Sequence, residues 1–190
     1  MSQDPTCDPN IMKGKQLPPR RSPLNPRSLV DMGNQCLKQG DFKGALVAYD
    51  LAATFLPEDA QLALLRAVAL LQLGRWDECV ASAEASLKLK PDQPSAHTLR
   101  GAALIELARY DEALHALDRA LELNPSAPDA MYNKACAYSL MGEGEQALRW
   151  LQQAAEIYPD YREIAREDRN LEFLRQQPAF QTGYEAILGD

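Results

Sequence analysis

The sequence predicts an all-α protein, a superhelical solenoid of four tandem helix-turn-helix repeats followed by C-terminal capping helices. Three observations predict this fold: a period of 34 residues, small residues at fixed places in each period, and a proline at the end of each. A single helical hairpin cannot bury its apolar face alone, so at least three such repeats must stack. The sequence supplies four.

The 34-residue period is carried by prolines and by small residues. Four prolines mark it at equal intervals, at Pro57, Pro91, Pro125 and Pro159. Two columns of small residues keep the interval: Gly40, Gly74, Ala108 and Gly142 between the helices, and Ala45, Cys79, Ala113 and Ala147 in the second helices. Small residues let two helices approach closely. Glycine accepts the positive φ that follows a helix, and proline ends the second helix.

These columns resemble the tetratricopeptide-repeat (TPR) family, whose pattern combines small, aromatic and proline positions at this period. The first repeat matches the pattern at Gly33, Ala45, Tyr49 and Pro57. The resemblance implies a right-handed superhelix over residues 25–159, with repeats at about 26–57, 58–91, 92–125 and 126–159. The fourth turn, Gly142-Glu143-Gly144, departs from the pattern because it lacks the aromatic residue of the other three turns.

Both flanks differ from the repeats. Residues 1–24 contain five prolines and few large apolar residues, so we expect a disordered, Pro-rich leader. Within it, Leu17–Pro23 could instead be a polyproline II ligand, and Ser22 a phosphorylation site beside two arginines. Residues 160–190 return to helical spacing, which predicts capping helices for the end of the solenoid. Apolar residues in the last helix recur every four positions, at Phe180, Tyr184 and Leu188.

Catalytic and metal-binding patterns were not found. The two histidines, His97 and His115, belong to different helices of the third repeat, and no ligand spacing for a metal accompanies them. No phosphate-binding loop and no nucleophile elbow occurs. Acidic pairs such as Asp77-Glu78 begin second helices, where the helix dipole favours carboxylates. We therefore predict that the chain is not an enzyme and uses neither a metal nor another cofactor.

Charge and cysteine usage narrow the partners and the compartment. The net charge is −7; residues 1–24 hold four basic and two acidic residues, which leaves −9 for the remainder. An acidic body argues against nucleic-acid binding, because phosphate binding needs a basic face. The four cysteines are scattered without a CxxC pair, which fits a reducing compartment, so we expect a cytoplasmic location. No apolar run reaches the length of a membrane span, and no signal peptide is expected.

The resemblance to the TPR family implies that first helices line a concave groove that selects the partner. The stretch QLALLRAVALLQLG, from Gln61 to Gly74, is apolar almost all round, which indicates burial on more than one side. We therefore expect a non-enzymatic protein–protein interaction module, an adaptor, scaffold or chaperone-like protein, that binds an apolar peptide or helix. The candidate groove residues are Asn34, Leu64, Leu65, Val68, Leu71, Leu99, Ile105, Tyr132, Asn133 and Cys136.

Two other functions stay open beside the adaptor. One is a scaffold that self-assembles through the same surface, and the other is a secretion-type chaperone for hydrophobic clients. Those chaperones usually carry three repeats rather than four. A third class within the family grips peptides ending in EEVD with Lys, Asn and Arg from successive first helices. Here Asn34 alone matches, and the other places hold Val30, Leu65, Ser95 and Leu99, so we do not expect an EEVD-tail clamp for Hsp70 or Hsp90.

Overall fold

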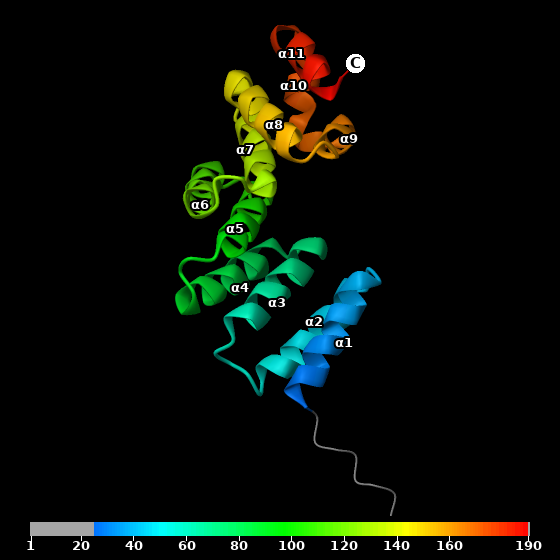
Figure 1. The fold of residues 1–190 in the computed structure, drawn as a ribbon, viewed down its shortest axis with the longest axis vertical. Coiled ribbons are helices and arrows are strands. Elements are labelled where there is room, and N and C mark those ends of the chain that lie inside the picture. The colour runs from blue at the N-terminus through cyan, green and yellow to red at the C-terminus, as the bar shows by residue number, and fades with distance from the viewer. Residues whose placement is uncertain (1–24, 190) are drawn as a thin grey trace, which may run out of the picture.

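The computed structural model describes residues 25–189, so the predicted leader, residues 1–24, lies outside the described residues. Every element of the described chain is helical. The repeat helices are α1 (Pro26–Lys38), α2 (Phe42–Ala53), α3 (Ala60–Gln72), α4 (Trp76–Leu89), α5 (Pro94–Glu106), α6 (Tyr110–Leu123), α7 (Pro128–Leu140) and α8 (Gly144–Ile157). They form four hairpins stacked along the long axis of the molecule (Figure 1), which confirms the predicted solenoid.

The chain continues beyond the fourth hairpin in four short helical elements. These are α9 (Tyr161–Glu167), the 3-10 turn η1 (Arg169–Leu171), α10 (Glu172–Gln176) and α11 (Pro178–Leu188). They pack on α7 and α8 at the end of the molecule opposite to α1 (Figure 1). Leu171, Leu174, Tyr184 and Leu188 are buried there, whereas Ile164 is exposed.

Local chemistry fixes the start of the first hairpin and the turn of every hairpin. The side chain of Asn25 accepts a hydrogen bond from the backbone N–H of Arg27 at 3.0 Å and caps α1, which begins with proline. The turn after each first helix contains one residue with positive φ: Gly40, Gly74, Gly142 and, with φ of 56°, Ala108. Three of the four turns therefore use the residue that adopts this conformation without steric cost.

Close packing explains the small residues of the first helices. A Cβ atom on Gly33 would lie 2.3 Å from the Tyr49 ring, and one on Gly101 would lie 2.7 Å from Leu117. Both distances are far shorter than a van der Waals contact. The glycines therefore let the two helices of a hairpin approach until the large side chain of the second helix fills the space between them.

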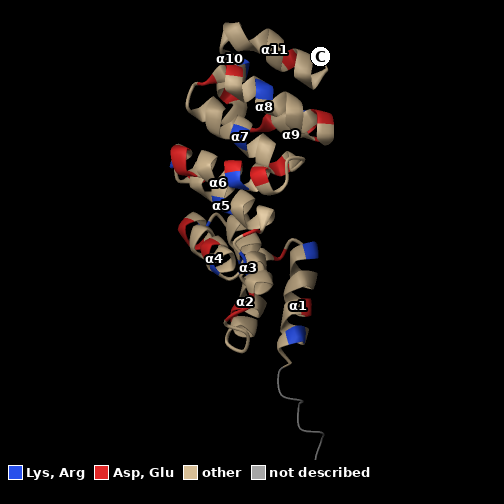
Figure 2. Ribbon diagram, turned by 60° about the vertical axis from the view of Figure 1, so that its left-hand side comes forward, with Lys and Arg blue, Asp and Glu red and all other residues tan. Residues whose placement is uncertain are grey.

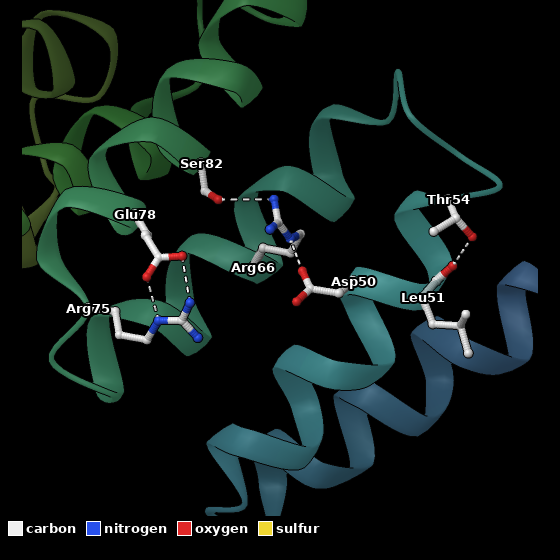
Figure 3. A network of polar contacts seen from close by, with 7 residues as sticks. All are labelled: Asp50, Leu51, Thr54, Arg66, Arg75, Glu78 and Ser82. Atoms are coloured by element: carbon white, nitrogen blue, oxygen red, sulfur yellow. Dashed lines mark hydrogen bonds and ion pairs between the residues drawn. The ribbon is translucent and has the colours of Figure 1, made fainter.

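Ion pairs that recur with the same 34-residue period join neighbouring repeats. An acidic residue on a second helix faces a basic residue on the next first helix, at Asp50–Arg66 (2.7 Å), Glu84–Arg100 (3.4 Å) and Asp118–Lys134 (2.5 Å). Figure 3 shows Arg66 reaching Asp50 on one side and the Ser82 hydroxyl, at 3.3 Å, on the other. Acidic and basic members each recur every 34 residues. The sequence carries this signal in its charged columns, which the apolar and small columns do not reveal.

The two ends of the solenoid are finished in different ways. On α1, Ser28 and Gln35 are exposed. The same places in later repeats hold buried apolar residues: Leu62, Ala96 and Ala130, and Ala69, Ala103 and Ala137. The outer face of α1 therefore suits water rather than a preceding repeat.

At the other end, the C-terminal helices supply what the fourth hairpin lacks. The ring of Phe180, on α11, lies against Gly144, where a Cβ atom would come within 2.4 Å of it. Phe173 lies near Gly142 and contacts Phe180, with ring centroids 5.7 Å apart. The missing turn aromatic is thus replaced from a distant part of the sequence, and Gly144 leaves the room for it.

Candidate functional site: the concave groove

The first helices form the inner layer of the solenoid. Helix α3 contacts α5, and α5 contacts α7, while each also packs on its own second helix. In Figure 1 these first helices follow one another along the axis, with α4 and α6 to one side. We call the surface formed by α1, α3, α5 and α7 the concave face. Helix α3 carries Arg66 as its one charged residue and is almost entirely uncharged in Figure 2.

Six of the predicted groove residues are half-buried, with part of each side chain accessible: Asn34, Leu65, Val68, Leu71, Leu99 and Asn133. Leu65, Leu71 and Leu99 pack with one side against the core. Their contact with a partner stays a prediction.

The other four predicted groove residues are buried, which corrects their assignment to an open groove. Ile105 belongs to the core, and Leu64 borders the groove with little exposed surface. Tyr132 and Cys136, on α7, are buried and hydrogen-bonded to Asp168 of the C-terminal segment. In this conformation the four residues pack within the chain and present little surface to a partner.

A hollow of about 440 Å³ opens on the concave face between α3, α5 and the start of α7. We call it the α3–α5 hollow. Its apolar side is formed by Leu64, Val68 and Leu99, all three of them predicted groove residues. Polar residues also line it: Ser95, Thr98, Asn124 and Asp129. A lining of apolar side chains with a few polar groups is the usual composition of a site that holds a ligand by shape and burial.

The α7 end of the concave face is covered by the chain itself. The ring of Tyr161 stacks on Tyr132 with centroids 4.3 Å apart, and the Tyr161 hydroxyl donates to Asp129. The Asp168 carboxylate accepts hydrogen bonds from the Tyr132 hydroxyl at 2.8 Å and from the Cys136 thiol, with a sulfur–oxygen distance of 3.6 Å. Tyr132 and Cys136 on α7 therefore offer little accessible surface, whereas Leu65, Val68 and Leu99 on α3 and α5 stay partly accessible.

Burial sets the protonation of these donors. It raises the pKa of the Tyr132 phenol, and the neighbouring Cys136 and Asp168 raise it further. Burial also raises the pKa of the Cys136 thiol well above its usual range, and the Asp168 charge adds to this effect. Both groups therefore keep their protons at neutral pH and donate to the carboxylate.

Asn34 has a structural partner. Its side-chain oxygen accepts a hydrogen bond from the Tyr49 hydroxyl at 2.8 Å, which ties α1 to α2. Asn133, the other predicted asparagine, has no hydrogen-bond partner for its side chain within the described chain. Of the two amides, Asn133 is the freer to meet the backbone of a bound peptide, but it stands beside the covered α7 end.

Reasoning from the sequence missed the residues that cover α7. Tyr161, Asp168 and Arg169 meet partners 32, 36 and 63 residues away in sequence, at Asp129, Tyr132 and Glu106. No column or period links these pairs, so no sequence signal could have found them.

Between residues 25 and 189, no group of His, Cys, Asp and Glu side chains is arranged to hold a metal ion. None of the helices in that range has both the length and the apolar character of a membrane span.

Two family models match the chain. The model of anaphase-promoting complex, cyclosome, subunit 3 matches residues 38–120, and a tetratricopeptide-repeat model matches residues 104–166. Together with the four stacked hairpins, these matches show that the chain belongs to the TPR family. The TPR fold is that of a protein–protein interaction module. No curated protein sequence matches the chain.

Solved structures agree on the fold. MamA from Desulfovibrio magneticus RS-1 is 21% identical with a TM-score of 0.69, and the match covers 86% of this chain and 91% of that one. A thermophilic TPR protein from Thermus thermophilus, TTC0263, is 18% identical with a TM-score of 0.67, covering 87% and 100%. The first TPR domain of Spaghetti (RPAP3), bound to the HSP90 peptide SRMEEVD, is 25% identical with a TM-score of 0.59, covering 61% and 92%.

Proposed function

We propose that this chain is a non-enzymatic adaptor or chaperone-like module that holds an apolar peptide or helix on its concave face, over α3 and α5. The observation that carries the proposal is the α3–α5 hollow, where Val68 and Leu99 are partly accessible beside Leu64. Leu65 and Leu71 add accessible apolar surface on the same first helix. Large contiguous apolar patches on a protein surface usually mark an interaction site.

The energetics require several contacts at once. Complete burial of one aliphatic side chain is worth roughly 1.5–3 kcal/mol. Micromolar binding needs about 8 kcal/mol after the ordering of the peptide has been offset. A partner must therefore bury several apolar side chains along α3 and α5, which favours a continuous apolar segment over a single anchoring residue.

The test separates binding from stability. Peptides selected from a display library on the wild-type chain should carry aliphatic residues and bind with micromolar affinity by calorimetry. Changing Leu65 and Val68 together to serine should weaken that binding at least tenfold while the melting temperature stays within a few degrees. The matched control changes Val47 and Leu51 to serine on α2 and should leave binding unchanged. Equal binding by the groove variant and the control would refute the proposal, as would unfolding of the groove variant.

An EEVD peptide should not bind. The first TPR domain of Spaghetti (RPAP3) is solved with such a peptide, but clamp positions of this chain carry apolar or small side chains. Val30, Leu65, Ser95 and Leu99 cannot offer the charge-assisted hydrogen bonds that a terminal carboxylate requires. We expect no heat of binding when SRMEEVD is titrated into the chain by calorimetry. Micromolar affinity would contradict this expectation.

A second candidate is a self-assembling scaffold, and a surface outside the groove favours it. Three apolar side chains of the second helix α2 and the turn after it are spaced four residues apart and exposed: Val47 (69%), Leu51 (39%) and Phe55 (50%). Such a stripe is suited to contact another protein surface. Light scattering after size exclusion tests this candidate, because a monomer at high micromolar concentration would exclude it.

A further inference from the structure

We propose that residues 161–171, which we call the cover segment, act as an internal ligand of the concave face. The segment occupies the α7 end of the groove, and a partner reaches that end only by displacing it. The proposal rests on the proposed function, because it treats the concave face as a binding surface. It adds that the chain competes with its own partner.

The cover segment meets the concave face through aromatic and polar side chains, while its Ala165 and Leu171 are buried in the core. Two of its side chains contact Tyr132 on α7. The Tyr161 ring stacks on the Tyr132 ring, and the Asp168 carboxylate accepts a hydrogen bond from the Tyr132 hydroxyl at 2.8 Å. Arg169 then reaches across to α5, where it pairs with Glu106 at 2.8 Å. The Arg169 side chain is 78% exposed, so this ion pair is open to water and to competition by another charged group.

One position on α7 is polar where the earlier first helices are apolar. At one place on the first helices the earlier repeats hold Leu37, Leu71 and Ile105, whereas α7 holds Ser139. The Ser139 hydroxyl is buried and has no hydrogen-bond partner within the described chain. A buried hydroxyl without a partner costs stability, and this cost falls when a C-terminal element packed on α7 moves and lets water reach the hydroxyl.

The C-terminal helices have a separate anchor. Phe180 on Gly144 and Gly183 against Leu148 fasten α11 to α8, away from the concave face. The Tyr184 hydroxyl, on α11, donates to the carbonyl of Ala165 in the cover segment at 2.5 Å and so holds the segment to α11. A displaced cover segment therefore stays tethered beside the groove, where its effective concentration makes it a strong competitor.

Native cysteines report whether the cover segment opens. Cys136 lies beneath Asp168, and Cys79 lies in the core between repeats, where burial raises its pKa to about 12. Alkylation of each thiol in the folded full chain is followed by mass spectrometry. Changing Tyr161 and Arg169 together to alanine should speed the labelling of Cys136 at least tenfold and leave Cys79 unchanged. Arg162→Ala, an exposed arginine on the same helix, is the matched control and should change neither rate.

A second arm tests the segment as a ligand. The synthetic peptide YREIAREDRNL, residues 161–171, is added to the double variant at up to millimolar concentration. It should restore the protection of Cys136, whereas a scrambled peptide should not. An unchanged Cys136 rate in the double variant overturns the proposal, and so does a failure of the peptide to restore protection.

If both thiols of the double variant react faster together, that variant has unfolded. The comparison is then made with Arg169→Ala alone, whose exposed side chain makes unfolding unexpected. A Cys136 rate equal to that of the wild type would overturn the proposal. Neither arm uses a foreign partner, so failure here leaves the binding test of the Leu65 and Val68 variant to judge the proposed function separately.

Discussion

At the scale of single residues, the turns between paired helices show where this chain departs from its own pattern. Ala108 is the one non-glycine residue with positive φ among residues 25–189. Alanine in this left-handed region is destabilised because its Cβ atom approaches the following carbonyl oxygen. The third hairpin therefore carries a strain that the other three hairpins avoid with glycine.

Changing Ala108 to glycine should stabilise the protein. We expect the free energy of unfolding to rise by about 1 kcal/mol, since the strain is larger than the extra chain entropy of glycine. Urea denaturation measures the change. Gly74→Ala is the mirror control and should lower stability by a similar amount. A destabilised Ala108→Gly variant would contradict the strain derived from the backbone.

At the scale of helices, the junction between α6 and α7 differs from the earlier ones. Lys134 is buried and forms an ion pair with Asp118. Its Nζ atom lies 3.8 Å from the centroid of the Trp150 ring. At the first junction both Arg66 and Asp50 keep substantial exposure. Removing a carboxylate leaves an unpaired charge in either case, but that charge costs more where it cannot reach water.

Asp118→Ala should therefore be more harmful than Asp50→Ala. We expect Asp118→Ala to lower the free energy of unfolding by about 1–2 kcal/mol, a modest value because the Asp118 side chain is half-exposed. Asp50→Ala should lower it by less than about 1 kcal/mol. Chemical denaturation of both variants under the same conditions provides the comparison. Equal losses would show that the buried environment of Lys134 does not matter for stability.

The C-terminal cap gives a second prediction at this scale. Phe180→Ala removes the ring that lies against Gly144, and the loss should be about 1–3 kcal/mol because the ring is only half-buried. Phe55→Ala, a control at an exposed phenylalanine, should cost less than about 0.5 kcal/mol. Thermal unfolding distinguishes the two. A neutral Phe180→Ala variant would mean that α11 does not complete the fourth hairpin.

The repeat helices could be predicted because every repeat shows the same residue pattern. The columns at Gly33 and Tyr49 recur with compatible residues in every repeat, so a departure in a single repeat does not hide the pattern. The missing aromatic at Gly144 was visible in the sequence. Its replacement by Phe180 was not, because a contact formed once between distant segments has no period to reveal it.

At the scale of the whole molecule, the candidate site was predictable in part for the same reason. Leu65, Val68 and Leu99 lie on first helices, and the repeat pattern places first helices on the concave face. Tyr132 and Cys136 were assigned to the groove by the same pattern, yet the fold of residues 161–171 buries them. Repeat geometry predicts which surface faces inward, but the segments outside the repeats decide how much of that surface is open.

The most direct test of this account is hydrogen–deuterium exchange of the full chain with and without a display-selected apolar peptide. We expect the bound peptide to slow amide exchange in α3 and α5 and to leave the exchange of α2, α4 and α6 unchanged. In the wild type, α7 should exchange slowly in both states, because either the cover segment or a peptide that displaces it protects this helix. Protection confined to the second helices would contradict the account, since the peptide would then bind outside the concave face.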